Sequence, residues 1–265
     1  MKKSITGLAA AIAAVAMPFT TQAALVQLQV KVENLVAANG IAFAPLHLGF
    51  HSGTFDAFNI GEVATTPIVS VAEGGSGSAW FPAFTVADGT ATLGTVLPNP
   101  PGPLIPGATA TATFAVDTDV NPFFTFASMA VPSNDFFIGN DDPMEYRLFD
   151  TNGALAINQI EQLASEIWDA GSESFDPLGA AFLAVGTNNL RTGQHSVVAF
   201  NFAELAAFNG LVTGAGYTLD SQLRGDSAVY RISFAVVPAP VPLPAALPLL
   251  LGGLGLLGVS TRRKV

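Results

Sequence analysis

Two short acidic segments hold the side chains whose types and settings best suit metal chemistry. Asp135 comes just after an apolar, strand-like run, and Asp169 opens a second acidic loop that also contains Glu173. Calcium prefers oxygen ligands that several loops deliver to one place. If the two loops meet at one end of the fold, these acids would bind a divalent cation, but taken by spacing alone they also suit ordinary turns.

A third acidic segment has the spacing that opens an EF-hand calcium loop, with Asp117, Asp119 and Asn121 at alternate positions. The sixth position is Pro122 instead of glycine, and the twelfth is Ser128 instead of glutamate. A complete EF-hand loop is therefore excluded. These acids remain turn formers or contributors to another site.

The histidines do not have the spacing of a zinc site. His47 and His51 lie in a segment that looks extended, and residues four apart on a strand are separated by roughly 13 Å. Zinc needs a third protein ligand, and only His195 remains. We expect ordinary polar contacts for them.

Nothing in the chain has the pattern of a nucleophilic or nucleotide-binding enzyme. It lacks Gly-x-Ser-x-Gly, and the Gly/Ser-rich residues 74–77 lack the lysine of a phosphate-binding loop. The absence of cysteine excludes disulfides, thiol catalysis and thiolate zinc sites. We expect no enzymatic activity. The alternative that stays open is a matrix glycan hydrolase with paired carboxylates, such as Asp169 and Glu173.

The charge distribution argues against a nucleic-acid partner. All 20 acids lie between Glu33 and Asp226, whereas five of the 10 basic residues lie in the first three and last four positions. The middle of the sequence, residues 4–261, therefore has a net charge of −15, which repels phosphate backbones and attracts divalent cations or basic partners.

The elements that must position these side chains are mostly strands. In residues 25–34, Val26, Leu28, Val30 and Val32 alternate with polar residues, as in a half-buried strand. Gly- and Pro-rich turns separate similar runs, which predicts an all-β, antiparallel eight-stranded β-sandwich. One helix is expected around Ile160–Ile167. The other strand-like runs are 79–86, 108–116, 123–131, 144–149, 180–185, 196–202 and 228–237.

Both ends of the chain are targeting segments. Lys2 and Lys3, an apolar stretch and small residues before Ala24 predict a signal peptide over residues 1–23. Near the other end, a Pro-rich stretch precedes an apolar helix and a basic end, which predicts a membrane anchor oriented with its basic end in the cytoplasm.

The C-terminal segment, residues 238–265, resembles a PEP-CTERM sorting signal. The resemblance rests on Val241, Pro242, Leu243 and Pro244 before the apolar helix, and on Arg262 and Arg263 after it. It implies processing by an exosortase-like enzyme in a Gram-negative bacterium that makes exopolysaccharide. A plain C-terminal anchor is the alternative.

The body, residues 24–237, is similar to a spondin domain, with four patches in the family's order. The first three patches are 30–35, the segment from Ala44 to Gly74, and 127–135, which has the Ser-Met-x-x-Pro-[ST]-x-Asp pattern. The last is Asp169-Ala170-Gly171-Ser172-Glu173. The resemblance implies an eight-stranded sandwich with a divalent ion, expected to be Ca²⁺, at one end.

The family's metal ligands fall on Asp135 and Asp169 in this sequence. A third family acid lands on Val116, which cannot bind a metal, so Asp117 or Glu173 is left as the candidate third ligand. The leading hypothesis is an exported, surface-held, non-catalytic binding or matrix protein, with exopolysaccharide or a cell-surface ligand as its partner. A structural or adhesive spacer without a functional metal is the alternative.

Overall fold

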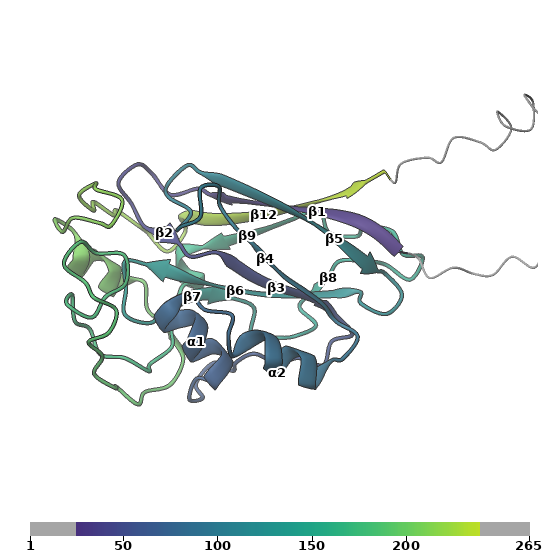
Figure 1. The fold of residues 1–265 in the computed structure, drawn as a ribbon, viewed down its shortest axis with the longest axis horizontal. Helices are drawn as coiled ribbons and strands as arrows, with labels where there is room; N and C mark the ends of the chain where they lie inside the picture. Colours follow the sequence, from purple (N-terminus) through teal and green to yellow (C-terminus); the bar gives the residue numbers. More distant parts are fainter. Residues whose placement is uncertain (1–24, 239–265) are drawn as a thin grey trace, which may run out of the picture.

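The computed structural model describes residues 25–238, which form two antiparallel sheets packed face to face, with two helices outside the larger sheet (Figure 1). The predicted signal peptide and the sorting residues 241–244, 262 and 263 lie outside the described residues. In residues 25–238 no helix is long and apolar enough to cross a membrane.

The smaller sheet has the strand order β5-β1-β12-β9. Its strands are β1 (Leu25–Asn34), β5 (Thr109–Asp117), β9 (Gln159–Leu163) and β12 (Ala228–Val237). The alternation predicted for residues 25–34 is confirmed, because Leu28, Val30 and Val32 are buried against the larger sheet. In the antiparallel pairing of β1 with β12, Val30 lies opposite Phe234 and Val32 lies opposite Ile232.

The larger sheet has eight strands, six of them in the order β11-β10-β7-β6-β3-β4, while β2 and β8 pair separately with β6. The long central strand β6 is buried along almost its whole length because both of its faces are covered. The strands are β2 (Ala42–Phe43), β3 (Leu46–His51), β4 (Thr92–Val96), β6 (Phe123–Val131), β7 (Phe136–Gly139), β8 (Tyr146–Arg147), β10 (Trp168–Asp169) and β11 (Ala199–Phe200).

The predicted antiparallel sandwich is therefore confirmed in architecture, but the strand count differs. Of the twelve strands in residues 25–238, β2, β8, β10 and β11 have only two residues each, which leaves eight longer ones. The run expected at 144–149 forms a strand only over Tyr146–Arg147, and the run at 196–202 only over Ala199–Phe200. The run at 180–185 makes isolated bridges instead of a strand.

The strand predicted over 79–86 is wrong, since these residues form helix α2 (Trp80–Ala87). Trp80 and Phe84 are one helical turn apart and are both buried on the outer face of the larger sheet. Helix α1 (Thr66–Gly74) precedes it, begins at the N-cap Thr65 and ends at Gly75 in the left-handed conformation. The aromatic and β-branched residues of α2 have strand-like preferences, but packing against the sheet decides its conformation.

The helix expected around Ile160–Ile167 is also wrong. Its residues divide between strand β9 and the short 3-10 helix η1 (Ala164–Glu166), and Ile167 links η1 to strand β10. Ile160 lies opposite Ile232 in β12, so its burial comes from sheet pairing instead of from a helix face. The spacing of three to four residues therefore arises from a sequence that crosses from one sheet to the other.

Candidate functional site

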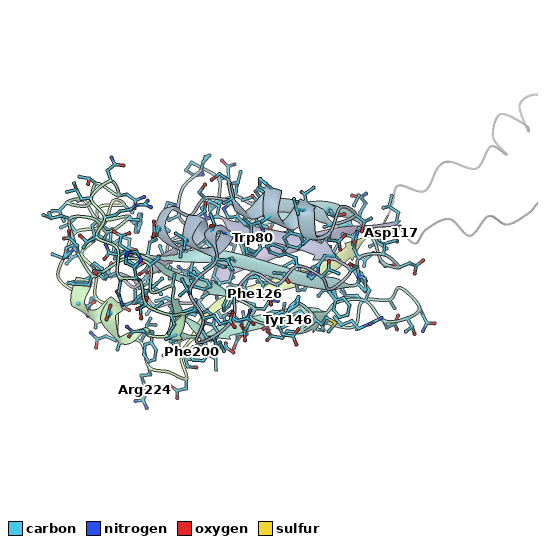
Figure 2. All side chains as sticks on the ribbon, turned by 90° about the horizontal axis from the view of Figure 1, so that it is seen from below. Trp80, Asp117, Phe126, Tyr146, Phe200 and Arg224 are labelled. Carbon is cyan, nitrogen blue, oxygen red and sulfur yellow. The ribbon has the colours of Figure 1, made fainter. Side chains whose placement is uncertain are left out.

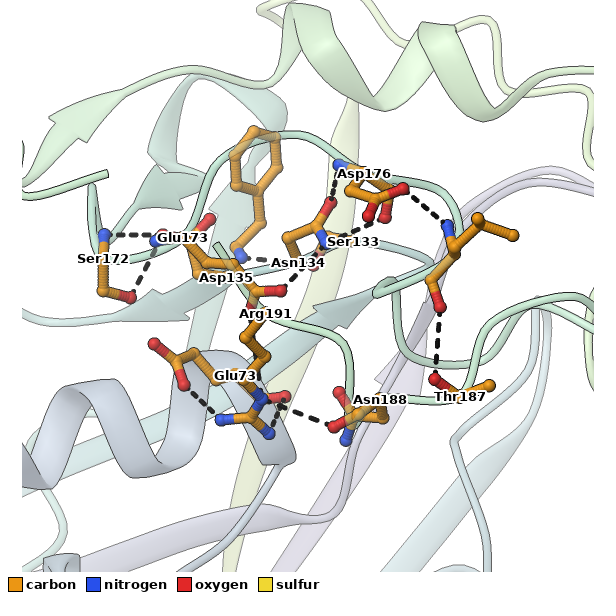
Figure 3. A network of polar contacts seen from close by, with 12 residues as sticks. Glu73, Ser133, Asn134, Asp135, Ser172, Glu173, Asp176, Thr187, Asn188 and Arg191 are labelled. Carbon is orange, nitrogen blue, oxygen red and sulfur yellow. Dashed lines mark hydrogen bonds and ion pairs between the residues drawn. The ribbon is translucent and has the colours of Figure 1, made fainter. Parts of the chain in front are cut away.

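Asp135 lies in the loop between β6 and β7 and is almost fully buried, with 2% of its surface exposed. Its Oδ2 accepts hydrogen bonds from the backbone N–H groups of Ser172 and Glu173, at 2.8 and 2.9 Å, and from the Ser172 hydroxyl. The loop after β10 thus wraps around this carboxylate (Figure 3).

Asp169 comes to the same place through sheet pairing. Strand β10 is antiparallel to β7, with Asp169 opposite Phe136, and the N–H of Ala170 donates to the carbonyl of Asp135. Asp169 Oδ1 accepts the N–H of Gly171 at 2.7 Å. Gly171 has a φ of +66°, and a Cβ there would lie 2.8 Å from the backbone of Ser196, so this turn requires glycine.

Burial and nearby negative charge disfavour the ionisation of both Asp135 and Asp169. Burial, and next the negative charge of Asp169, raise the pKa of Asp135 to about 7, although three hydrogen bonds oppose the change. Burial also raises the pKa of Asp169. Carboxylates that repel each other at one buried point are stabilised by a cation or by a proton.

Glu173 is a third acid at this end of the sandwich, and burial raises its pKa. Its Oε1 accepts a hydrogen bond from Asn134, whereas its buried Oε2 has no hydrogen-bond partner. The nearest cationic group is Arg191, whose Nε is 4.0 Å away and whose guanidinium also pairs with Glu73 of helix α1 (Figure 3). Glu73 and Asn134 lie inside the patches 44–74 and 127–135 but were given no role at the site, and no local motif marks Arg191.

A cavity of about 10 Å³ lies among these groups, with room for one water-sized particle. Asp135, Glu173 and Glu204 supply its charged lining, and Asn134 and Ser133 add amide and hydroxyl groups. Glu204 also raises the pKa of Asp169. The cavity is therefore small and acidic.

Asp117 does not join this site. It ends β5 at the end of the molecule from which both termini leave (Figures 1 and 2). From there β6 carries the chain to the opposite end, which separates Asp117 from Asp135 by about 30 Å. Asp117 Oδ1 instead accepts the N–H groups of Asp119 and Val120, as a turn-forming aspartate does.

The residues present fit a calcium ion only in part. Within residues 25–238, no three His, Cys, Asp or Glu side chains converge closely enough to hold a metal. Asp135 and Asp169 would therefore supply the charge, and the rest of a shell of six to eight oxygens would come from carbonyl groups, amides and water. Oε2 of Glu173, which accepts no hydrogen bond and lies 4.0 Å from Arg191 Nε, is a further acidic acceptor at this end of the sandwich.

The histidines are engaged elsewhere. His47 and His51 lie on β3, in a segment that was expected to be extended. The ring nitrogens of His47 contact the Thr95 hydroxyl and the carbonyl of Gly75. Those of His51 contact the Thr125 hydroxyl and the N–H of Gly53. Burial lowers the pKa of both, to about 4 for His51. Neutral, hydrogen-bonded histidines of this kind fit the predicted ordinary polar contacts.

Comparison with known proteins places the chain in no family, since no family model and no curated protein matches it.

Proposed function

We propose that this protein is an exported, surface-held, non-catalytic β-sandwich of the spondin-like type, and that it binds a divalent cation between Asp135 and Asp169. The observation that carries the proposal is the convergence of these two buried carboxylates, one from the loop before β7 and the other from strand β10. Calcium is the preferred ion because the site offers only oxygen ligands and no thiolate or imidazole. The resemblance at residues 127–135 and 169–173 supports the same two ligands.

Calcium at millimolar concentration should raise the melting temperature of the body by a few degrees. An ion that binds only the folded state adds RT ln(1 + [Ca²⁺]/Kd), which is about 1 kcal/mol for a Kd in the extracellular range of roughly 10⁻⁴–10⁻³ M. A domain of this size gains about 2–4 °C from that increment. Differential scanning calorimetry with calcium and with chelator measures it.

Asp135→Asn and Asp169→Asn test the two proposed ligands, and Asp56→Asn is their matched control. The first two substitutions should abolish the calcium increment, whereas Asp56 is exposed and outside the site, so its substitution should preserve the increment. Identical wild-type melting curves with calcium and with chelator would instead support a structural spacer without a functional metal.

Removal of residues 241–265 should release the body into the medium. The reason is that the apolar run and the basic end, with Arg262 and Arg263, form the predicted membrane anchor. Fractionation of expressing cells followed by immunoblotting checks this, and truncated protein that stays with the membranes contradicts it. Replacing Pro242 and Pro244 with alanine should block processing if the tail is a sorting signal, and should change nothing if it is a plain anchor.

A further inference from the structure

A shallow groove of about 430 Å³ runs along the open edge of the larger sheet, outside the acidic cavity. Strand β11 forms this edge, and the chain that follows it provides one wall. The lining consists of two aromatic residues, one alanine and three hydrogen-bonding side chains: Phe200, Phe202, Ala203, Ser165, Glu166 and Asn201.

Phe200 is a flat and rigid platform in this groove. Its ring stacks on Trp168 with 3.7 Å between the centroids and 25° between the planes, yet 51% of its surface is exposed. Trp168 is itself buried and packs edge-to-face against Phe58. In Figure 2, Phe200 lies at the lower margin of the view, well away from Asp117 at the right-hand end. One face of an aromatic ring is thus held open to solvent by a buried partner.

The polar groups beside this platform are also fixed in position. One oxygen of Glu166 accepts the N–H of Leu163 at 2.7 Å, which leaves the second oxygen to accept a bond from a ligand. The backbone N–H of Asn201 donates to Ile167, and its side-chain amide lies 3.4 Å from Asp169. A carboxylate and an amide therefore flank an exposed aromatic ring.

We propose that this groove binds a neutral polysaccharide, with one pyranose ring on Phe200. A pyranose has an apolar C–H face that suits an aromatic ring, and peripheral hydroxyls that suit carboxylate and amide groups. Acidic glycans are disfavoured because Glu166 lies in the groove and residues 4–261 carry a net charge of −15. The inference rests on the groove alone and does not depend on the proposed cation.

Affinity electrophoresis tests the proposed binding of a neutral polysaccharide. The gels contain hydroxyethyl cellulose, galactomannan, laminarin or dextran, and polygalacturonate is the acidic comparison. We expect at least one neutral polymer to retard the wild type in the presence of chelator. Phe200→Leu should weaken the retardation about five- to tenfold, because it keeps apolar volume but removes the flat ring. Phe200→Tyr should retain it, and so should Phe175→Leu, which changes another exposed phenylalanine outside the groove.

A second readout uses the stacking partner. Trp168 is one of only two tryptophans, so oligosaccharide binding on Phe200 should change the intrinsic fluorescence, and Trp80→Phe should preserve that change. Melting curves confirm that each variant is folded. The proposal is overturned if no neutral polymer retards the wild type, if only polygalacturonate does, or if folded Phe200→Leu and Phe175→Leu behave alike.

Discussion

Replacing Phe124 with alanine should lower the free energy of unfolding by about 3–5 kcal/mol, the usual cost of removing a large aromatic side chain from a core. Phe124 is fully buried on β6 and contacts the rings of Phe50 and Phe126 in its own sheet. It also packs edge-to-face against Phe234 of β12, so it joins the two sheets. No disulfide can compensate, since the chain has no cysteine.

Urea denaturation followed by tryptophan fluorescence measures this loss. The matched control is Phe175→Ala, which makes the same chemical change at a site that is 45% exposed and should cost much less, about 1 kcal/mol. Because ordinary domains have only about 5–15 kcal/mol of stability, the Phe124 variant should unfold at a clearly lower urea concentration. Equal losses for the two variants would contradict the role assigned to the contact between the sheets.

Asp135→Asn should stabilise the calcium-free protein at pH 8.5 and have little effect near pH 4. The pKa of Asp135 is about 7 in the folded state, above the ordinary aspartate value of 3.8, because of burial and the charge of Asp169. The folded state therefore binds the proton more tightly, and the wild type loses stability as pH rises from about 4 to 7. Ionisation of the buried carboxylate costs up to roughly 4 kcal/mol above that window.

Asparagine removes this cost because it keeps an oxygen for the N–H groups of Ser172 and Glu173 but carries no charge. Urea denaturation with chelator at pH 4.5, 6, 7 and 8.5 measures the difference between wild type and variant. A difference that does not grow with pH would contradict the assignment.

Asp88→Asn is the opposite case and serves as a control. Burial opposes ionisation of Asp88, but hydrogen bonds from the hydroxyls and backbone N–H groups of Ser52 and Thr90 outweigh it and hold its pKa below the usual range. Its stabilisation is present above the unfolded-state pKa and is lost as pH falls. Asp88→Asn should therefore destabilise the protein at neutral pH, where Asp135→Asn already stabilises it.

The strands with one solvent-facing side could be predicted from the sequence by itself. Strands β1, β5 and β12 were expected within one residue of their observed bounds. In β1 a period of two marks one face buried against the other sheet and one face in water. The whole of β6 was also expected, because an apolar run bounded by turn signals is typical of a strand covered on both sides.

The helices could not be predicted in this way. The residues of α2 have strand-like propensities, and only the outer face of the larger sheet, built from segments far away in the chain, selects the helix that buries Trp80 and Phe84. Likewise, Ile160 and Ile167 have helical spacing, but Ile160 lies in β9 of the smaller sheet and Ile167 lies just before β10 of the larger one. Local preference is weak compared with burial, so packing decides such segments.

The candidate site, too, could be predicted only in part from the sequence. The sequence determined that Asp135 follows a strand-like run, that Asp169 opens an acidic loop and that both carry the resemblance, whereas only the tertiary structure decided which acids meet. Pairing of β10 with β7 brings Asp169 beside Asp135, and the loop after it supplies Glu173. Asp117 is nearer to Asp135 in sequence than Asp169 is, but the extended strand β6 carries the chain the length of the sandwich between them. Distance in a folded chain depends on the course of the strands, which spacing along the sequence does not encode.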